Sequence, residues 1–241
     1  MNAHKGFSTF FSENTNTALA EVFNTCQSLS ISGAGNVSSK TFIFSKLPLG
    51  DEKIIWLTTT SQDQEAVHRA LNFWAEGDIE NFQLLKAKDA QFNKEVARQN
   101  ELATMEKIAR LMEKGRYVLT VRYEDLFEKF PKKQKVKEAI ITLKKGDEID
   151  PLDFFQRLIT NGYEVSDDPH LTKGTYVKRG EVVEIFPVNV DRPLRLSLDF
   201  DKLERIEIAD DLGLYSPYGD TLQIYPIFVE KGGNVLDYLG K

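Results

Sequence analysis

The sequence predicts an α/β protein in which a parallel sheet comes first and a small antiparallel α+β unit follows. Up to about residue 130, apolar runs alternate with amphipathic stretches, which is typical of strand–helix–strand units with parallel strands. After about residue 140, shorter strands follow one another at hairpin spacing. The chain has 241 residues, 41% apolar and 28% charged, enough for one large domain or two small ones.

The first part contains four apolar runs and three amphipathic segments, the first of which predicts a helix over residues 14–28. Lys53–Thr59 (K-I-I-W-L-T-T) is nearly continuous in its apolar character, as expected of a strand buried on both faces of a parallel sheet. Further strands are expected at Thr41–Phe44, Phe82–Leu85 and Tyr117–Val121. One helix is expected after Ser61 and another within residues 89–114, because apolar residues recur there at helical spacing.

The second part begins with a strand over Glu138–Leu143 and a helix. Asp150 is expected to cap that helix, with Pro151 at the first helical position, where proline is favoured. Strands follow at Thr175–Lys178, Glu181–Phe186, Leu194–Leu198, Leu203–Ile208 and Thr221–Tyr225. This pattern predicts a small antiparallel α+β unit.

Composition excludes several classes of protein. The net charge of −6 and the pI of about 5.3 argue against strong non-specific binding of nucleic acid by the whole chain. Cys26 is the only cysteine, and the three histidines lie far apart, so we expect neither an internal disulfide framework nor a structural metal site. No run is long and apolar enough to span a membrane, and the first residues lack a secretory pattern. We expect a cytoplasmic protein without a cofactor.

Residues 34–41 (A-G-N-V-S-S-K-T) approximate a phosphate-binding loop, G-x-x-x-x-G-K-[ST]. Lys40 and Thr41 match the pattern, but Ala34 and Ser39 stand where its two glycines belong, and Gly35 is one position off. Glycines are needed there because the backbone must wrap the phosphates in conformations that other residues resist. No strand ending in Asp-Glu follows to hold Mg²⁺. The sequence therefore predicts a degenerate loop and no enzymatic activity.

A lysine-rich run covers residues 129–137 and includes Lys132, Lys133 and Lys135. It could contact DNA, another phosphate or an acidic partner. It contains a single aromatic residue and no interleaved stacking side chains, so it is weak as a platform for single strands. A solvated linker is the favoured interpretation.

The region after residue 140 resembles a known family. G-T-Y-V-K-R-G-E-V-V-E-I-F-P at 174–187 and R-P-L-R-L-S-L-D-F-D-K-L-E-R-I-E-I-A-D at 192–210 resemble the UvrA-interaction domain shared by UvrB and the transcription-repair coupling factor (Mfd). Upstream, L-K-K-G-D-E-I-D and L-I-T-N-G-Y match the entry to that domain. K-I-I-W-L-T-T-T, E-L-A-T-M-E-K-I-A-R-L and Y-V-L-T-V resemble more loosely the RecA-like part that precedes it.

The resemblance implies a domain organisation. Residues 1–140 would form an incomplete RecA-like, P-loop NTPase-like domain with a parallel sheet. Residues 141–212 would form the inserted α+β interaction domain, and residues 213–241 would return to the first domain. UvrB has an intact phosphate loop and an aromatic-rich hairpin that clamps DNA, and neither is seen between Thr41 and Glu101. The chain thus resembles the N-terminal module of a coupling factor, either as a fragment or as a stand-alone relative.

The resemblance also implies a function: a non-catalytic module of nucleotide excision repair or transcription-coupled repair that binds UvrA. RNA polymerase and DNA would be contacted only through domains outside this chain. The alternatives are the nucleotide-binding lobe of a DNA-dependent ATPase and a DNA-binding module that uses the lysine run. The residues expected at the partner surface are Tyr176, Lys178, Arg179, Gly180, Phe186 and Arg195.

Two departures from the family pattern predict an altered surface. Glu164 and Val165 follow the Gly-Tyr pair, where the family often places an arginine. Val177 stands where UvrB has the first arginine of F-R-V-R-G, and Lys178 would replace it in part, although lysine lacks the planar fork for bidentate pairing. Another interpretation of Arg179 is an ion pair across the hairpin with Glu181 or Glu184.

Overall fold

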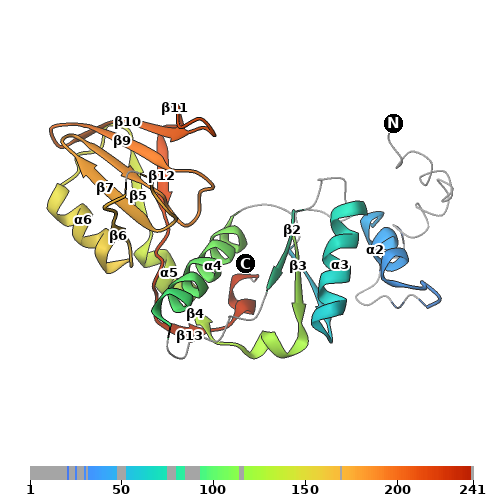
Figure 1. The fold of residues 1–241 in the computed structure, drawn as a ribbon. Coiled ribbons are helices and arrows are strands. Elements are labelled where there is room, and N and C mark those ends of the chain that lie inside the picture. The colour runs from blue at the N-terminus through green and yellow to red at the C-terminus, as the bar shows by residue number, and fades with distance from the viewer. Residues whose placement is uncertain are drawn as a thin grey trace. The chain divides into compact units, whose positions relative to one another are not determined.

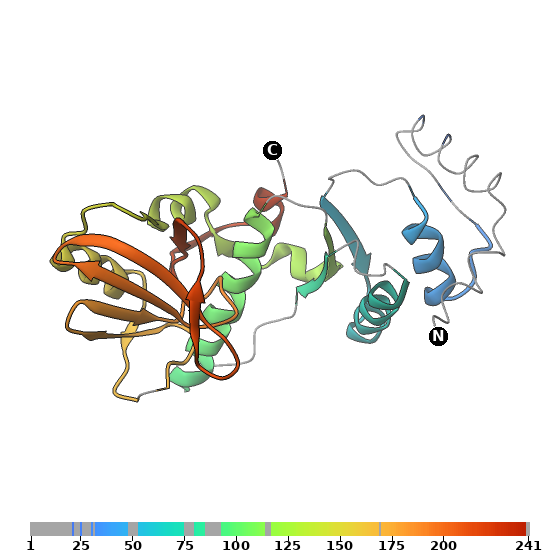
Figure 2. The same ribbon diagram turned by 90° about the horizontal axis from the view of Figure 1, so that it is seen from above.

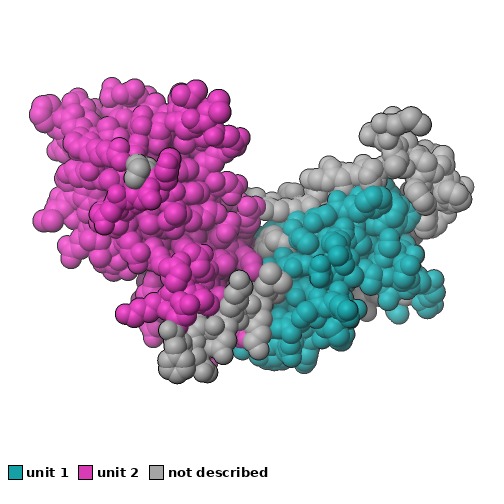
Figure 3. Space-filling model, viewed as in Figure 1, with its two compact units in different colours: residues 1–85, 114–127 teal, residues 86–113, 128–241 magenta. Residues whose placement is uncertain are grey.

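The computed structural model describes residues 32–47, 53–74, 80–84, 93–113, 117–168 and 170–239, together with the single residues 21, 25 and 30. The helix expected over residues 14–28 lies outside these ranges, apart from the single residues 21 and 25. The chain divides into two compact units, which Figure 3 colours separately. Unit 1 comprises residues 1–85 and 114–127, and unit 2 comprises residues 86–113 and 128–241.

A three-stranded parallel sheet forms the centre of unit 1, with strand order β1-β3-β2 (Figure 1). The strands β1 (Lys53–Thr58) and β2 (Glu80–Leu84) each pair in parallel with β3 (Tyr117–Arg122). The sequence prediction of these three strands is confirmed. The middle strand β3 is buried from Tyr117 to Val121, which explains why its sequence is apolar throughout.

Two helices pack in unit 1, α2 (Val37–Ser45) and α3 (Ser61–Trp74), and Figure 2 shows them side by side. Val67 and Leu71 of α3 are buried with Val118 of the central strand. The ring of Trp74 meets Phe42 of α2 edge to face, at 4.8 Å between ring centroids. The apolar stripe expected after Ser61 therefore does face the sheet.

One predicted strand is wrong, because Thr41–Phe44 lies inside helix α2. The side-chain oxygen of Asn36 accepts a hydrogen bond from the backbone N–H of Ser39 at 3.1 Å and caps the helix. A four-residue apolar run carries too little periodicity to distinguish a strand from a helix turn. Here the cap and the packing against α3 decide the conformation.

The mixed α/β composition is confirmed, but three parallel strands do not establish a RecA-like domain. Most strand pairs of the described chain are antiparallel, and these lie in unit 2. None of its helices is long and apolar enough to cross a membrane, as far as the chain is described.

Unit 2 contains a six-stranded sheet in the order β11-β10-β9-β8-β7-β6. All neighbours are antiparallel except the pair β6–β7. This confirms the antiparallel α+β unit. The strands are β6 (Glu164–Val165), β7 (Thr175–Arg179), β8 (Val182–Ile185), β9 (Leu194–Asp199), β10 (Lys202–Ala209) and β11 (Tyr215–Pro217).

The helix α6 (Pro151–Thr160) packs on this sheet through the ring of Phe155. This ring stacks on that of Tyr176 with 5.5 Å between the ring centroids. Asp150 accepts a hydrogen bond from the backbone N–H of Leu152 at 2.9 Å, and Pro151 opens the helix, as predicted.

The remaining elements of unit 2 connect segments far apart in the sequence. They are α4 (Lys94–Met112), β4 (Phe130–Pro131), α5 (Lys133–Ala139), β5 (Ile141–Lys144), β12 (Thr221–Ile224), β13 (Lys231–Gly233) and η4 (Val235–Tyr238), whereas η3 (Tyr123–Phe127) belongs to unit 1. The C-terminal strands β12 and β13 pair with β5 and β4. The hydroxyl of Tyr238 donates to the carbonyl oxygen of Pro131 at 2.7 Å.

Helix α4 joins unit 2 because Arg98 ties it to the segments around α6 and β7. Its guanidinium donates to the carbonyl oxygens of Gly162 and Gly174, at 3.1 and 3.0 Å. The compact units therefore group α4 with the six-stranded sheet, whereas the sequence prediction assigns it to the domain 1–140. The domain boundaries at 140 and 212 stay a prediction.

Gly174 allows a close approach that a larger residue would block, since it has φ +84° and a Cβ there would lie 2.8 Å from Ile227 and 2.9 Å from Leu102. We expect Gly174→Ala to lower the free energy of unfolding by about 2–4 kcal/mol, because left-handed strain and overpacking add up. Urea denaturation measures this. Gly213→Ala is the control: φ is +75° with open space around it, so about 1–2 kcal/mol is expected. Equal losses in both variants would contradict the packing argument.

Candidate protein-interaction surface

The hairpin β7–β8 presents the Arg-Gly pair at its tip. Arg179 pairs with Val182, which leaves Gly180 and Glu181 as a two-residue loop. Gly180 has φ +61° with open space around it, as hairpin loops of this length require at their first position. Lys178, Arg179 and Gly180 are all exposed, as expected for a partner surface.

Strand register decides which side chains share a face. Arg179 of β7, Val182 of β8, Ser197 of β9 and Arg205 of β10 lie directly across from one another. A second row consists of Val177, Glu184, Arg195 and Glu207. We call these two rows the outer face, because the alternate residues of the same strands, such as Leu194 and Leu196, are buried on the other side.

Arg195 is held by an ion pair within this face. Its Nε and Nη2 lie 3.1 and 2.7 Å from Oε1 of Glu184, the residue directly across the strands. The guanidinium carbon lies 3.7 Å from the ring centroid of Tyr215, whose hydroxyl donates to the same Oε1 at 3.3 Å. Burial opposes the charge of Arg195, but hydrogen bonds and the negative charge of Glu184 outweigh it and raise the arginine pKa.

Arg179 has a different environment. It is exposed and forms no ion pair with any other residue of the described ranges. The alternative interpretation, an ion pair with Glu181 or Glu184, is wrong, since no such pair occurs among the described residues; Oε1 of Glu184 pairs instead with Arg195 at 2.7 Å. The charge of Arg179 therefore remains available to a partner.

The other residues predicted for this surface have different positions. Tyr176 is only 4% exposed and stacks on Phe155, so it supports the sheet from inside. Lys178 lies across from Val183 on the same inner side, with its Nζ 5.4 Å from the ring centroid of Phe155. Phe186 is half-buried, with the Nζ of Lys173 at 5.9 Å from its ring centroid.

Lys178 consequently cannot replace an arginine at position 177. Val177 shares the outer face with Arg179, whereas Lys178 projects to the opposite side, because successive side chains of a strand alternate. At the sheet edge, Glu164 pairs with Arg98 of α4 at 2.9 Å, and Val165 is exposed.

Arg205 joins the outer face although the sequence analysis did not single it out. An irregularity of register between Leu203 and Arg205 inserts Glu204 as an extra residue in β10. Without it, Arg205 would alternate in step with buried Leu203 and point inward. No sequence signal marks the bulge, so only the structure reveals this residue.

The segment predicted to be a degenerate phosphate loop lies in unit 1. Gly35 is exposed with φ +71°, and Lys40 is exposed on α2. The Thr41 hydroxyl is buried and donates to the carbonyl oxygens of Val37 and Ser38, at 3.0 and 2.9 Å. Its proton is thus committed to the helix backbone.

The lysine run is not an irregular linker, since α5 begins at Lys133 and the helix includes Lys135. Lys135 pairs with Glu138 at 3.2 Å. The side chain of Lys132 lies over Gly232, where a Cβ would be 2.8 Å from its Cε. At least two lysines of the run therefore have neighbours within the fold, and a role of the run in contacting DNA stays a prediction.

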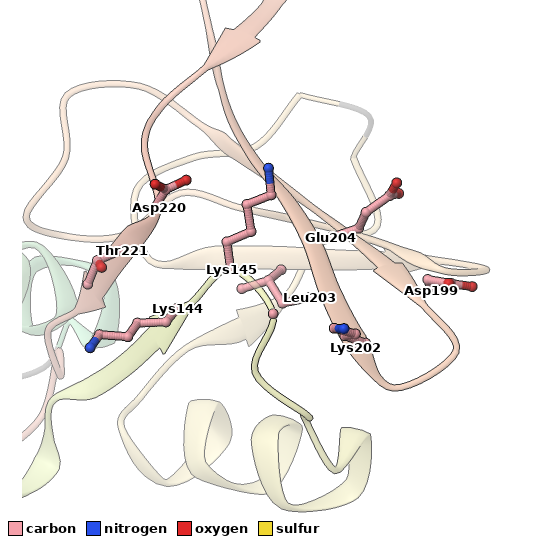
Figure 4. Close-up of a pocket in the computed structure, with 9 residues that line it drawn as sticks. Lys144, Lys145, Asp199, Lys202, Leu203, Glu204, Asp220 and Thr221 are labelled. Carbon is pink, nitrogen blue, oxygen red and sulfur yellow. The ribbon is translucent and has the colours of Figure 1, made fainter.

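An open pocket of about 780 Å³ lies beside the hairpin β9–β10 (Figure 4). Figure 4 shows the amino groups of its three lysines pointing in different directions. Within the described ranges, no cluster of three or more His, Cys, Asp or Glu could hold a metal ion. The pocket mixes both signs of charge, from Lys144, Lys145, Lys202, Asp199, Glu204 and Asp220.

Comparison with known proteins agrees with the resemblance found in the sequence. The family model of the UvrB interaction domain matches residues 141–216, which run from β5 into β11 and include the whole outer face. The transcription-repair-coupling factor of Borreliella burgdorferi is 31% identical over 93 residues, which are 39% of this chain and 8% of that protein.

UvrABC system protein B of Streptomyces avermitilis is 29% identical over 137 residues, 53% of this chain and 18% of the relative. The protein of the same name from Treponema denticola is 30% identical over 140 residues, 58% and 20% of the two chains. The matches thus span a fifth or less of the length of these relatives.

We expect Glu184→Gln to lower the free energy of unfolding by about 1 kcal/mol, because a charge-assisted pair that is partly shielded from water becomes a neutral hydrogen bond. Urea denaturation measures the change. Glu204→Gln is the matched control, since Oε2 of Glu204 lies 3.7 Å from Nε of Arg205 and both side chains are more than half exposed. We expect it to change the free energy of unfolding by no more than about 0.5 kcal/mol. Equal effects of the two substitutions would show that the ion pair of Glu184 with Arg195 stabilises the fold no more than an exposed surface pair does.

Proposed function

We propose that this chain, whose residues 141–216 match the family model of the UvrB interaction domain, acts in nucleotide excision repair as a non-catalytic module that binds UvrA. The relatives are named UvrABC system protein B and transcription-repair-coupling factor, which supports a role in DNA repair. The UvrA partner and the absence of catalysis are our proposals.

The observation that carries the proposal is the exposed guanidinium of Arg179. It shares the outer face with Arg195 and Arg205, and no residue of the described chain neutralises it by an ion pair. A planar guanidinium suits bidentate pairing with a carboxylate. The outer face therefore fits an acidic region of a partner, and Glu184 and Glu207 would restrict which carboxylates can approach.

We expect Arg179→Glu to weaken binding of UvrA about 10–100-fold, because charge reversal at a contact replaces attraction by repulsion. Titration calorimetry with purified UvrA measures this, and the thermal midpoint should not change, since Arg179 is exposed.

Lys178→Glu makes the same change of charge on the adjacent residue but on the opposite side of the strand. We expect it to alter affinity by less than about threefold. Equal effects of the two variants, or no effect of either, would contradict the assignment of the outer face.

We also propose that unit 1 is an incomplete RecA-like part whose phosphate loop binds no nucleotide. Support comes from the parallel sheet, and from a Thr41 hydroxyl that already donates within α2. We therefore expect no saturable binding of ATP at micromolar concentration, and no difference between the unchanged chain and Lys40→Ala in a fluorescent-nucleotide titration. Saturable binding that Lys40→Ala abolishes would contradict this proposal and favour the nucleotide-binding lobe of an ATPase.

A further inference from the structure

The loop of the hairpin β9–β10 carries an aromatic residue where a glycine is expected. Asp199 pairs with Lys202, so Phe200 and Asp201 form a two-residue loop. Phe200 has φ 57° and is the one non-glycine residue of the described chain with a positive φ. Primed hairpin turns need a positive φ at this first position, and glycine is preferred because side chains are strained there.

The fold offers no packing that compensates for this strain. Phe200 is 82% exposed, and its ring makes no aromatic or cation–π contact with any other described residue. Strained backbone persists where it serves a purpose, and interaction sites are a common one. An exposed phenylalanine in this conformation is therefore suited to insert into an apolar pocket of another molecule.

Phe200 lies at the same end of the sheet as the Arg179–Gly180 tip. The backbone N–H of Leu198 donates to the carbonyl oxygen of Glu181 at 2.8 Å, so the two hairpin loops are neighbours. Ser197, three residues before Phe200, stands in the same cross-strand row as Arg179. A single surface of a partner protein can therefore contact both Phe200 and the Arg179–Gly180 tip.

The charges around Phe200 indicate the class of partner. Asp199 and Asp201 flank it and are exposed, and Figure 4 shows Asp199 and Lys202 beside the loop that joins their strands. The two carboxylates next to the ring oppose the approach of nucleic-acid phosphates, whereas the lysines Lys144, Lys145 and Lys202 line the pocket beside the hairpin. The ring with its two carboxylates complements a protein pocket that is apolar inside and lined with lysine or arginine at its rim.

We propose that Phe200 anchors the module in an apolar pocket with a basic rim on the partner protein. The proposal rests on the proposed function, under which that partner is UvrA. Buried aromatic side chains of this kind carry much of the energy of protein interfaces. Phe200 would supply affinity, and Arg179 would supply charge complementarity beside it.

The experiment measures binding of purified UvrA to the full chain by titration calorimetry. We expect Phe200→Gly to weaken binding at least about tenfold and Phe200→Tyr to stay within about threefold, because tyrosine keeps the ring. Leu212→Ser is the matched control: Leu212 is 84% exposed, follows the opposite end of β10, and its substitution should leave affinity unchanged. Asp199→Asn combined with Asp201→Asn should weaken binding and reduce its salt dependence.

Thermal unfolding separates binding from folding. Phe200→Gly should melt no lower than the unchanged chain, since glycine relieves the strain at φ 57°. A clear drop would mean that the ring packs within the fold, and would overturn the proposal. The proposal is also overturned if Phe200→Gly binds UvrA as tightly as the unchanged chain while Arg179→Glu binds more weakly, but this result leaves the proposed function intact. If the unchanged chain does not bind UvrA, both the proposed function and the role of Phe200 are wrong. Duplex binding that is lost in Phe200→Gly would replace the protein partner by nucleic acid.

Discussion

The antiparallel register of β8 between β7 and β9 is the constraint on which the outer face depends. Because side chains alternate along each strand, one register places Val183 and Ile185 in the core and Glu184 outside. A shift by one residue would exchange the two sets and bury a carboxylate. The buried valine and isoleucine therefore hold Arg179 and Arg195 on the solvent side.

Glu184 then decides how the arginines differ. It is directly across from Arg195, and Tyr215 completes the cluster through its ring and its hydroxyl. Among the described residues, Glu184 pairs with Arg195 and not with Arg179, which lies one row further along β7. The same pair thus gives the surface one arginine with a fixed position and one whose charge is uncompensated, which is a useful combination for recognising an acidic partner.

Helix α4 and the C-terminal strands support this sheet from segments far away in sequence. Arg98 reaches the carbonyl oxygens that precede and follow β6, and Gly174 lies against Leu102 and Ile227. Lys173 pairs with Glu106 at 2.8 Å, beside the same junction. The hairpin that carries Arg179 therefore starts from a point held by α4 and by the C-terminal segment, so its tip projects from a well-supported base.

The sequence by itself determined the longer elements, since alternation, caps and turn residues are local patterns. The strands of unit 2 with four or more residues, the Asp150–Pro151 helix start and the Arg179–Gly180 turn follow from neighbouring residues, whereas the short strands β4, β6, β11 and β13 were not predicted. The sequence also pointed to Arg179 and Arg195 through the resemblance. Tertiary structure decided what depends on distant partners. Packing against α3 makes Thr41–Phe44 helical, and a bulge in β10 turns Arg205 outward. Register assigns Glu184 to Arg195 and Lys178 to the inner side, because pairing across strands is set by contacts that no local pattern records.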